Sequence, residues 1–418
     1  MEDVSVRNTS ELKQKNLLDI IKIIRNKGPI TKPEIAKMTN LTSVTAHNFI
    51  CELIEKKLVV EVGTSKSNGG RRAVLYKINE MYGYIVGQNL GRHYVSTTIF
   101  DINLNMLYIN KVKCSLEYSY KILRLMVDEI ESAILKLQYD KKDCLGIGIT
   151  VPGQVNHETG VIINLTGIPN WNSIPLKRVV ENETGVKTYV DNDNNGIAIA
   201  AKWENIVSEN ADAVFITITD GVGTGVLSKG KLYYGSHSYA GEIGHTTIQY
   251  DGPKCSCGGR GCIEALASDF AIIEKVKKGI KNEAEINNSS DEEISIDTVI
   301  KLAKEGDETV YNILKEASFF ISIAIDHIIK VYDPEVIVIQ SNWLGEFNDL
   351  YYFTVDNMFT RCTWVKRDNL RILVNSVKDI EVNGPASLVL EMMFANIGDN
   401  VFMERISGPS IEEKIVNI

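Results

Sequence analysis

Residues His245–Glu264 read HTTIQYDGPKCSCGGRGCIE and hold three of the chain's seven cysteines within eight residues. A histidine stands ten positions before the first of them, so the spacing is H-x9-C-x-C-x4-C. Three thiolates and one imidazole are the donors that zinc prefers in a closed, tetrahedral structural site. Reduced surface cysteines are the alternative, but so tight a cluster favours metal. We therefore expect a structural Zn²⁺ bound by His245, Cys255, Cys257 and Cys262.

Two carboxylates flank this cluster, Glu242 three residues before the histidine and Glu264 two after the last cysteine. A metal-binding histidine uses one ring nitrogen and keeps the other free to donate a hydrogen bond. The metal would thus hold one donor and two acceptors near one point, which suits a ligand with many hydroxyls. Either glutamate alone could equally be a solvated loop residue, but the shared anchor favours a binding site.

The charge distribution of the 418 residues separates a basic head from an acidic remainder. Residues 1–78 contain 14 Lys and Arg against 8 Asp and Glu, whereas the whole chain has a net charge of −9. Such asymmetry indicates a nucleic-acid-binding domain joined to a different kind of domain. The sequence has no apolar run long enough to cross a bilayer and no signal peptide, so we expect a cytoplasmic protein with reduced cysteines and no membrane partner.

Residues 1–78 have the pattern of a winged helix-turn-helix domain. A helical stripe through Leu17, Ile20 and Ile24 ends at Gly28-Pro29, and a second helix begins near Thr31 with Ile35, Ala36 and Met38 facing inward. A third helix is expected to bury Val44, Phe49, Leu53 and Ile54, and a β-rich hairpin with a basic tip follows it.

The first turn of the third helix carries short polar side chains suited to base edges and phosphates. The expected DNA contacts there are Thr42, Ser43, Thr45, His47 and Asn48. Arg71 and Arg72 at the hairpin tip could enter the minor groove. A plain helical bundle with a solvated turn is the alternative, but helix order, wing and charge agree on DNA.

The body reads as an α/β fold in which strands alternate with helices, with hairpins at the start of each half. The residues predict a two-lobed structure with its ligand in a cleft. We expect a first lobe over 79–190, completed by a helix near 384–397, a second lobe over 191–383, and a tail over 399–418.

Three motifs, GEIGHTTI with CSCGGRGCIE, VDNDNN and DGVGTG, resemble the ROK family of repressors, open reading frames and sugar kinases. The head phrase KQKNLL and the wing GGRR are most similar to the xylose-responsive repressors of that family. The resemblance implies an actin-like, ribonuclease-H-like sugar-binding body. It implies sugar contacts from Asn164, Asn192, Asp193, Glu242, His245 and Glu264. In the kinases, the aspartate matching Asp193 is the catalytic base.

The motifs for nucleotide binding depart from the kinase pattern at two places. The kinases open with Asp-x-Gly-Gly-Thr, but this chain has Asn89 to His93, NLGRH, which removes the acid and adds bulk where backbone must approach phosphate. Gln340-Ser341 stands where a late Gly-Gly would cradle adenosine. We therefore expect no catalytic residue and no kinase activity.

The combined prediction is a sugar-responsive repressor that releases double-stranded operator DNA when it binds xylose or a related monosaccharide. It is expected to be a homodimer or a higher homo-oligomer. One alternative is an ATP-dependent sugar kinase with a DNA-binding head. Another is a sugar-sensing scaffold whose head binds protein.

Overall fold

The computed structural model describes residues 4–66, 72–165, 168–282, 294–374 and 380–395. Contacts between Cα atoms group the chain into two units. Unit 1 comprises Met1–Thr150, Pro175–Val190 and Pro385–Ile418, and unit 2 comprises Val151–Ile174 and Asp191–Gly384. Residues 151–174, which we expected in the first lobe, thus group with the second. Within the described residues, no helix is long and apolar enough to span a membrane.

The head, at the start of unit 1, has three helices and a three-stranded antiparallel sheet of order β1-β3-β2. The Thr42 hydroxyl caps the third helix by accepting the Thr45 N–H at 3.1 Å. Its elements are α1 (Val4–Lys27), β1 (Ile30–Thr31), α2 (Lys32–Thr39), α3 (Ser43–Glu55), β2 (Val59–Thr64) and β3 (Val74–Ile78).

Two side chains of the head lie outside the core, contrary to the helical stripes we predicted. Met38 is 49% exposed and Val44 is 70% exposed, while Ile35, Ile50 and Leu53 are fully buried. Val44 is only one residue into α3, where no neighbouring helix covers its face. The core is instead completed by Ala46, which lies nearer the middle of the helix.

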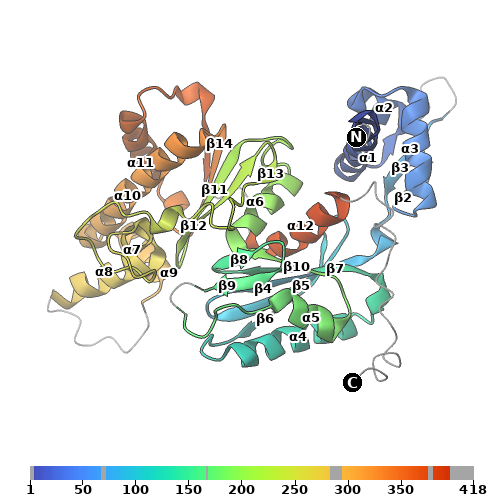
Figure 1. The fold of residues 1–418 in the computed structure, drawn as a ribbon. Coiled ribbons are helices and arrows are strands. Elements are labelled where there is room, and N and C mark those ends of the chain that lie inside the picture. Colours follow the sequence, from blue (N-terminus) through green and yellow to red (C-terminus); the bar gives the residue numbers. More distant parts are fainter. Residues whose placement is uncertain (1–3, 67–71, 166–167, 283–293, 375–379, 396–418) are drawn as a thin grey trace. The chain divides into compact units, whose positions relative to one another are not determined.

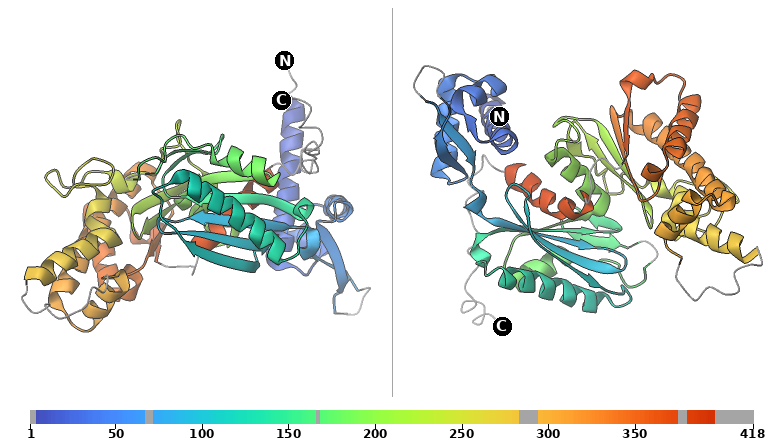
Figure 2. Two further views of the ribbon diagram at one scale, coloured as in Figure 1. Left: turned by 90° about the horizontal axis from the view of Figure 1, so that it is seen from below. Right: turned by 180° about the vertical axis from the view of Figure 1, so that it is seen from behind.

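The remainder of unit 1 is built on a five-stranded sheet of order β10-β7-β4-β5-β6 (Figure 1). Its central strand β4 pairs antiparallel with β5 and parallel with β7. Helices α4 and α5 cover one face, and α12 lies on the other (Figure 2). The elements are β4 (Tyr84–Leu90), β5 (Tyr94–Asp101), β6 (Met106–Lys113), α4 (Ser119–Lys136), β7 (Cys144–Val151), α5 (Leu176–Thr184), β10 (Thr188–Asn192) and α12 (Ile380–Ala395).

Unit 2 contains a second five-stranded sheet, of order β13-β12-β11-β14-β15. Its central strand β11 pairs antiparallel with β12 and parallel with β14. The strands are β11 (Ala213–Ile218), β12 (Val222–Ser228), β13 (Lys231–Leu232), β14 (Val336–Ser341) and β15 (Arg371–Val374). A separate hairpin pairs β8 (Gln154–Asn156) with β9 (Val161–Asn164).

The helices of unit 2 enclose a large apolar core on one side of the second sheet, with α10 at its centre. Val214, Ile216 and Ile218 of β11 point into this core. Helix α6 lies against β11 and β12. These helices are α6 (Asp193–Trp203), α7 (Ile263–Ala267), α8 (Asp269–Asn282), α9 (Ile296–Lys304), α10 (Glu308–Tyr332) and α11 (Asn348–Arg361).

Two of the motifs, VDNDNN and DGVGTG, lie largely in regular secondary structure. Helix α6 begins at Asp193, directly after β10, because the Asn192 side chain caps it by accepting the Asn194 N–H at 2.8 Å. Most of DGVGTG is strand β12, and a Cβ on Gly223 or Gly225 would lie 2.3 Å from an atom of Asn194. These glycines therefore let α6 approach the sheet closely.

Candidate functional site: a histidine–cysteine cluster and the hollow beside it

The four predicted metal ligands lie together in unit 2. One ligand atom from each of His245, Cys255, Cys257 and Cys262 lies within 4.8 Å of all the others. The Sγ atoms of Cys257 and Cys262 are 3.8 Å apart, far beyond the length of a disulfide bond. These side chains form a cluster that could hold a metal ion.

Tight turns give the cysteine loop its shape. The Cys255 N–H donates to Gly259 O at 2.9 Å, and the Gly258 N–H donates to Cys255 O at 3.1 Å. Gly261 has φ +59, and a Cβ there would lie 1.6 Å from Gln249 O, so only glycine fits at this position.

Burial opposes ionisation of two of the thiols, those of Cys255 and Cys262. Desolvation raises the pKa of Cys255 to about 12 and also raises the pKa of Cys262. A cation among the sulfurs would reverse this balance, because a coordinating thiol loses its proton. The donor set therefore fits a metal better than it fits exposed, reactive thiols.

The His245 ring joins the cluster to a carboxylate. Its Nδ1 lies 3.6 Å from Cys255 Sγ, and its Nε2 lies 3.9 Å from Glu242 Oε2. Burial raises the pKa of Glu242, while His245 opposes the rise. The ring thus has one nitrogen toward the thiols and the other toward Glu242, as we expected for a metal ligand with a second, free nitrogen.

Glu264 connects the cysteine loop to the second sheet. Its Oε1 accepts the Ser256 hydroxyl at 2.9 Å, and its Oε2 accepts the Val222 N–H at 3.3 Å. A Cβ on Gly221 would lie 2.8 Å from this Oε2, so the β11–β12 turn stays close to the carboxylate. Glu264 therefore positions the cysteine loop against the β11–β12 turn.

A hollow of about 570 Å³ lies beside the cluster, and we call it the His245 hollow. Asn164 and His245, two of the residues predicted to contact a sugar, line it. Three further polar residues line it that we had not singled out: Gln154, Asn172 and Ser256. Gln154 follows the Pro-Gly turn after a buried strand, a position that could have signalled it from sequence. The Asn164 amide donates to Gln154 Oε1 at 2.8 Å.

The other predicted sugar contacts, Asn192, Asp193, Glu242 and Glu264, are not among the described residues that line the hollow. Besides capping α6, Asn192 donates from Nδ2 to Gly153 O at 2.8 Å. Asp193 Oδ1 accepts the Asn194 N–H at 2.9 Å. Both side chains thus help to build the junction between β10 and α6.

The predicted DNA-contact residues lie at the start of α3 and at the wing. Thr42, Ser43, His47 and Asn48 are exposed, and Thr45 is half-buried. Arg72 is exposed, whereas Arg71 lies outside the described residues. The exposed polar turn is what a groove-reading helix needs.

The residues that replace the late glycine pair have structural roles of their own. Ser341 is buried, and its hydroxyl accepts the Leu344 N–H at 3.1 Å. Trp343 is fully buried next to it. Asn342 donates to Asp269 at 2.6 Å. A bulky, internally bonded strand end thus replaces the small residues that would admit adenosine.

Comparison with known proteins identifies the class. Residues 85–389 match the ROK family, and the chain belongs to it, as the motifs predicted. The xylose repressor of Caldicellulosiruptor bescii is 31% identical over 89% of this chain and 94% of its own length. The xylose repressor of Bacillus subtilis is 26% identical over 81% and 85%. The Escherichia coli DNA-binding transcriptional dual regulator NagC is 26% identical over 94% and 96%.

Solved structures agree on the fold. A ROK family transcriptional regulator, described as a homologue of E. coli MLC protein, has a TM-score of 0.77 and 26% identity, covering 93% of this chain and 98% of that one. The ROK hexokinase of Thermus thermophilus has a TM-score of 0.59 and 22% identity, covering 74% and 99%. The predicted two-lobed sugar-kinase fold is confirmed. Within the family this chain is a regulator and not an enzyme.

Proposed function

We propose that this chain is a transcriptional repressor that binds operator DNA with its head and a neutral sugar with unit 2. Sugar binding lowers its affinity for the operator. The names of the relatives make xylose, or a related monosaccharide, the first effector to test. A protein that binds the chromosome of a bacterium works in the cytoplasm.

The observation that carries this proposal is the set of polar side chains around the His245 hollow. Amides from Gln154, Asn164 and Asn172, the Ser256 hydroxyl and the His245 ring all line one space. Hydroxyl groups both donate and accept, and amides offer both functions at fixed positions. No lysine or arginine occurs among the described residues that line the hollow, so a neutral sugar suits it better than a sugar phosphate.

We propose zinc as the metal of the cluster. A tetrahedral zinc ion with bonds of about 2.3 Å to sulfur separates two sulfurs by about 3.8 Å. The Cys257–Cys262 separation is 3.8 Å, and the cluster supplies four ligands, which leaves no position for a reacting water. The zinc would be structural and would fix the loop that carries His245 and Ser256 into the hollow.

The DNA contacts follow from exposure. Ser43, His47 and Asn48 would read bases, and Arg72 would bind phosphates or a narrow minor groove. We propose a homodimer, because two heads at a fixed distance match a near-palindromic operator. Coupling of about 1.4 kcal/mol between sugar and operator is enough for a tenfold loss of affinity. Sedimentation at several protein concentrations tests the dimer.

A mobility-shift titration of operator DNA tests the function, with the parent protein and Asn172→Ala compared over a range of xylose concentrations. The variant should bind DNA as tightly as the parent but need at least about tenfold more sugar for release, because one hydroxyl of the sugar would lose its hydrogen-bond partner. Asn312→Ala, exposed on α10, is the matched control.

Release of DNA by the same sugar concentration in Asn172→Ala and in the parent would show that the His245 hollow is not the effector site. ATP consumption that requires sugar would instead favour the kinase alternative. Absence of any sequence-specific, salt-dependent DNA binding would favour the protein-binding scaffold.

A further inference from the structure

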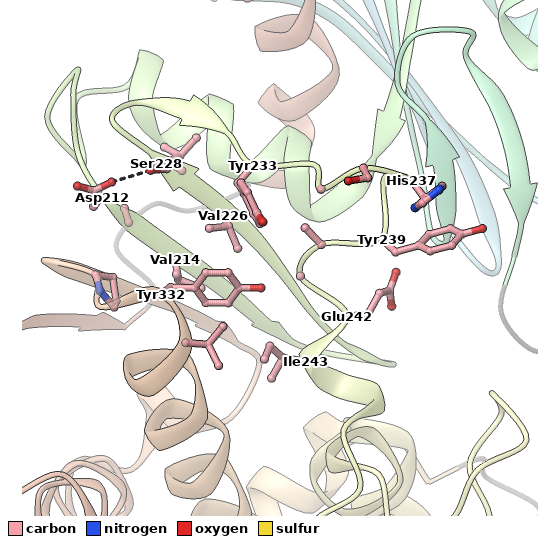
Figure 3. A pocket seen from close by; sticks show the side chains of 18 residues that line it. Asp212, Val214, Val226, Ser228, Tyr233, His237, Tyr239, Glu242, Ile243 and Tyr332 are labelled. Atoms are coloured by element: carbon pink, nitrogen blue, oxygen red, sulfur yellow. Dashed lines mark hydrogen bonds between the residues drawn. The ribbon is translucent and has the colours of Figure 1, made fainter.

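A second hollow of unit 2, of about 730 Å³, lies over strands β11 and β12 of the second sheet, near the end of α10 (Figure 3). We call it the tyrosine hollow. Val214 and Val226 of the sheet form an apolar floor. Tyr233 and Tyr332 also line it, and their rings pack against each other edge to face with centroids 6.4 Å apart. A volume of this size accommodates a small molecule.

The rim of the tyrosine hollow is polar and carries no positive side chain among its described lining residues. Tyr239 and His237 lie at the same end as Glu242 (Figure 3). Asp212 lies at the other end, where it accepts the Ser228 hydroxyl at 3.1 Å and the Lys229 N–H at 2.8 Å. Two carboxylates without a lysine or arginine disfavour phosphate or carboxylate ligands.

The loop that carries Tyr233 and Tyr239 is fixed by contacts of its residues Tyr234 and Ser238. The Tyr234 hydroxyl donates to Asp191 Oδ2 at 2.7 Å, and its ring stacks on His157 with centroids 3.7 Å apart. His157 Nδ1 also lies 2.9 Å from Ser238 Oγ. The hollow is therefore formed before any ligand arrives, which reduces the entropy that binding costs.

Glu242 connects the two hollows of unit 2. It lines the tyrosine hollow, and it accepts a hydrogen bond from Gln154 and lies 3.9 Å from His245 Nε2. Gln154 and His245 line the other hollow. A ligand that extended from the His245 hollow past Glu242 would enter the tyrosine hollow at the end where Tyr239 lies (Figure 3).

We propose that the tyrosine hollow is a subsite for the second ring of a neutral disaccharide whose first ring occupies the His245 hollow. Tyrosine rings offer an apolar face for the C–H face of a sugar and a hydroxyl for its rim. This inference rests on the proposed function, because it needs the first ring in place. If the inference is correct, a monosaccharide still binds in the His245 hollow, but a disaccharide binds more tightly.

Isothermal titration of the full chain with matched pairs of sugars tests the subsite: xylose and xylobiose, glucose and cellobiose. The better disaccharide should bind at least about tenfold more tightly than its monosaccharide. Tyr233→Ala and Tyr239→Ala should remove that advantage and leave monosaccharide affinity unchanged. Both side chains are about half exposed, so these variants should fold. Tyr352→Ala, 61% exposed on α11, is the control.

The outcomes separate the two proposals. Monosaccharide binding without any gain from the second ring would overturn the subsite and leave the effector site standing. A gain that survives in both tyrosine variants would place the second ring elsewhere. No binding of any of the four sugars would overturn both. A change of sedimenting mass in the tyrosine variants would show that the hollow is instead a contact between copies of the chain.

Discussion

The two five-stranded sheets have the same strand order and the same pairing around their central strands, yet they serve different purposes. In each, the first strand pairs antiparallel with the second and parallel with the fourth. Each sheet also carries two glycines separated by one residue, Gly146 and Gly148 in β7, and Gly223 and Gly225 in β12. A helix lies on each pair, α12 on the first and α6 on the second.

The sheets differ in what connects the third strand to the fourth. In unit 1, the main element between β6 and β7 is the helix α4. In unit 2, the connection between β13 and β14 contains Glu242, the histidine–cysteine cluster and helices α7 to α10. The same strand arrangement thus supports packing in both units, while one enlarged connection contributes the histidine–cysteine cluster and part of the proposed effector site. The following predictions test this division, from the largest expected effect to the smallest.

Gly148→Ala and Gly225→Ala should each destabilise their own sheet by about 3 kcal/mol, because the new Cβ would meet backbone. It would lie 1.8 Å from Pro385 O in the first case and 2.3 Å from Asn194 O in the second. Hydrogen exchange, followed peptide by peptide, locates the loss. Gly279→Ala in α8 is the control and should be neutral or slightly stabilising, since the nearest atom is 3.6 Å away. If either variant lowered hydrogen-exchange protection equally in both sheets, the two sheets would not be independent packing units.

Cys257→Ser should release the metal and destabilise unit 2 by about 2 kcal/mol or more, with little effect on unit 1. Metal analysis of protein purified without chelator should give about one zinc per parent chain and far less for the variant. Cys114→Ser, outside the cluster, should keep its metal. Parent protein without zinc would refute this prediction.

Asp269→Asn tests the protonation of a buried carboxyl next to the β11–β12 turn, where the backbone N–H of Asp269 donates to Thr219 O at 2.8 Å. Burial raises the pKa of Asp269 to about 7 from 3.8, although the Asn342 hydrogen bond opposes the rise. The protonated form is favoured in the folded state. Its contribution to stability is therefore complete below about pH 4 and is lost as the pH rises through about 7.

The free-energy difference between Asp269→Asn and the parent should therefore shift by about 2–3 kcal/mol in favour of the variant from pH 5 to pH 8.5. Urea unfolding at both pH values measures it, and comparing the two differences cancels any constant effect of the amide. A pH-independent difference would mean that Asp269 is ionised throughout.

Asn89→Asp with Arg92→Gly should change stability by less than about 0.5 kcal/mol, because both side chains lie at the partly exposed end of β4 and the turn after it. The double variant should still not consume ATP in the presence of sugar, since Gln340-Ser341 remains altered. A coupled ATPase assay with xylose and glucose measures this. Sugar-dependent turnover would show that the first departure alone had removed kinase activity.

Much of this division could be predicted from the sequence. The strands of both sheets are apolar runs bounded by turns, and the cysteine spacing identified the cluster, because both patterns are local. The nucleotide-site departures were also visible as changes from a known motif.

Contacts between distant segments could not be predicted. Gln154, Asn172 and Ser256 meet only because residues 151–174 group with the cysteine loop in unit 2. The roles of Asn192 and Glu264 could not be predicted for the same reason. The Asn192 amide donates a hydrogen bond to Gly153 O, and the Glu264 carboxylate accepts one from the Val222 N–H. Met38 and Val44 were misplaced because helical periodicity shows which residues share a face but not where that face ends.

The close approach of α6 to β12 also affects what the presence of the DGVGTG motif says about function. Any lineage that keeps Asn194 against this strand must keep Gly223 and Gly225, whether or not it has ever bound a nucleotide. Selection for packing alone would preserve these two glycines of DGVGTG in a chain without catalytic activity. In a genome survey, this stretch would therefore not separate regulators from kinases, whereas Asn89–His93 and Gln340-Ser341 would.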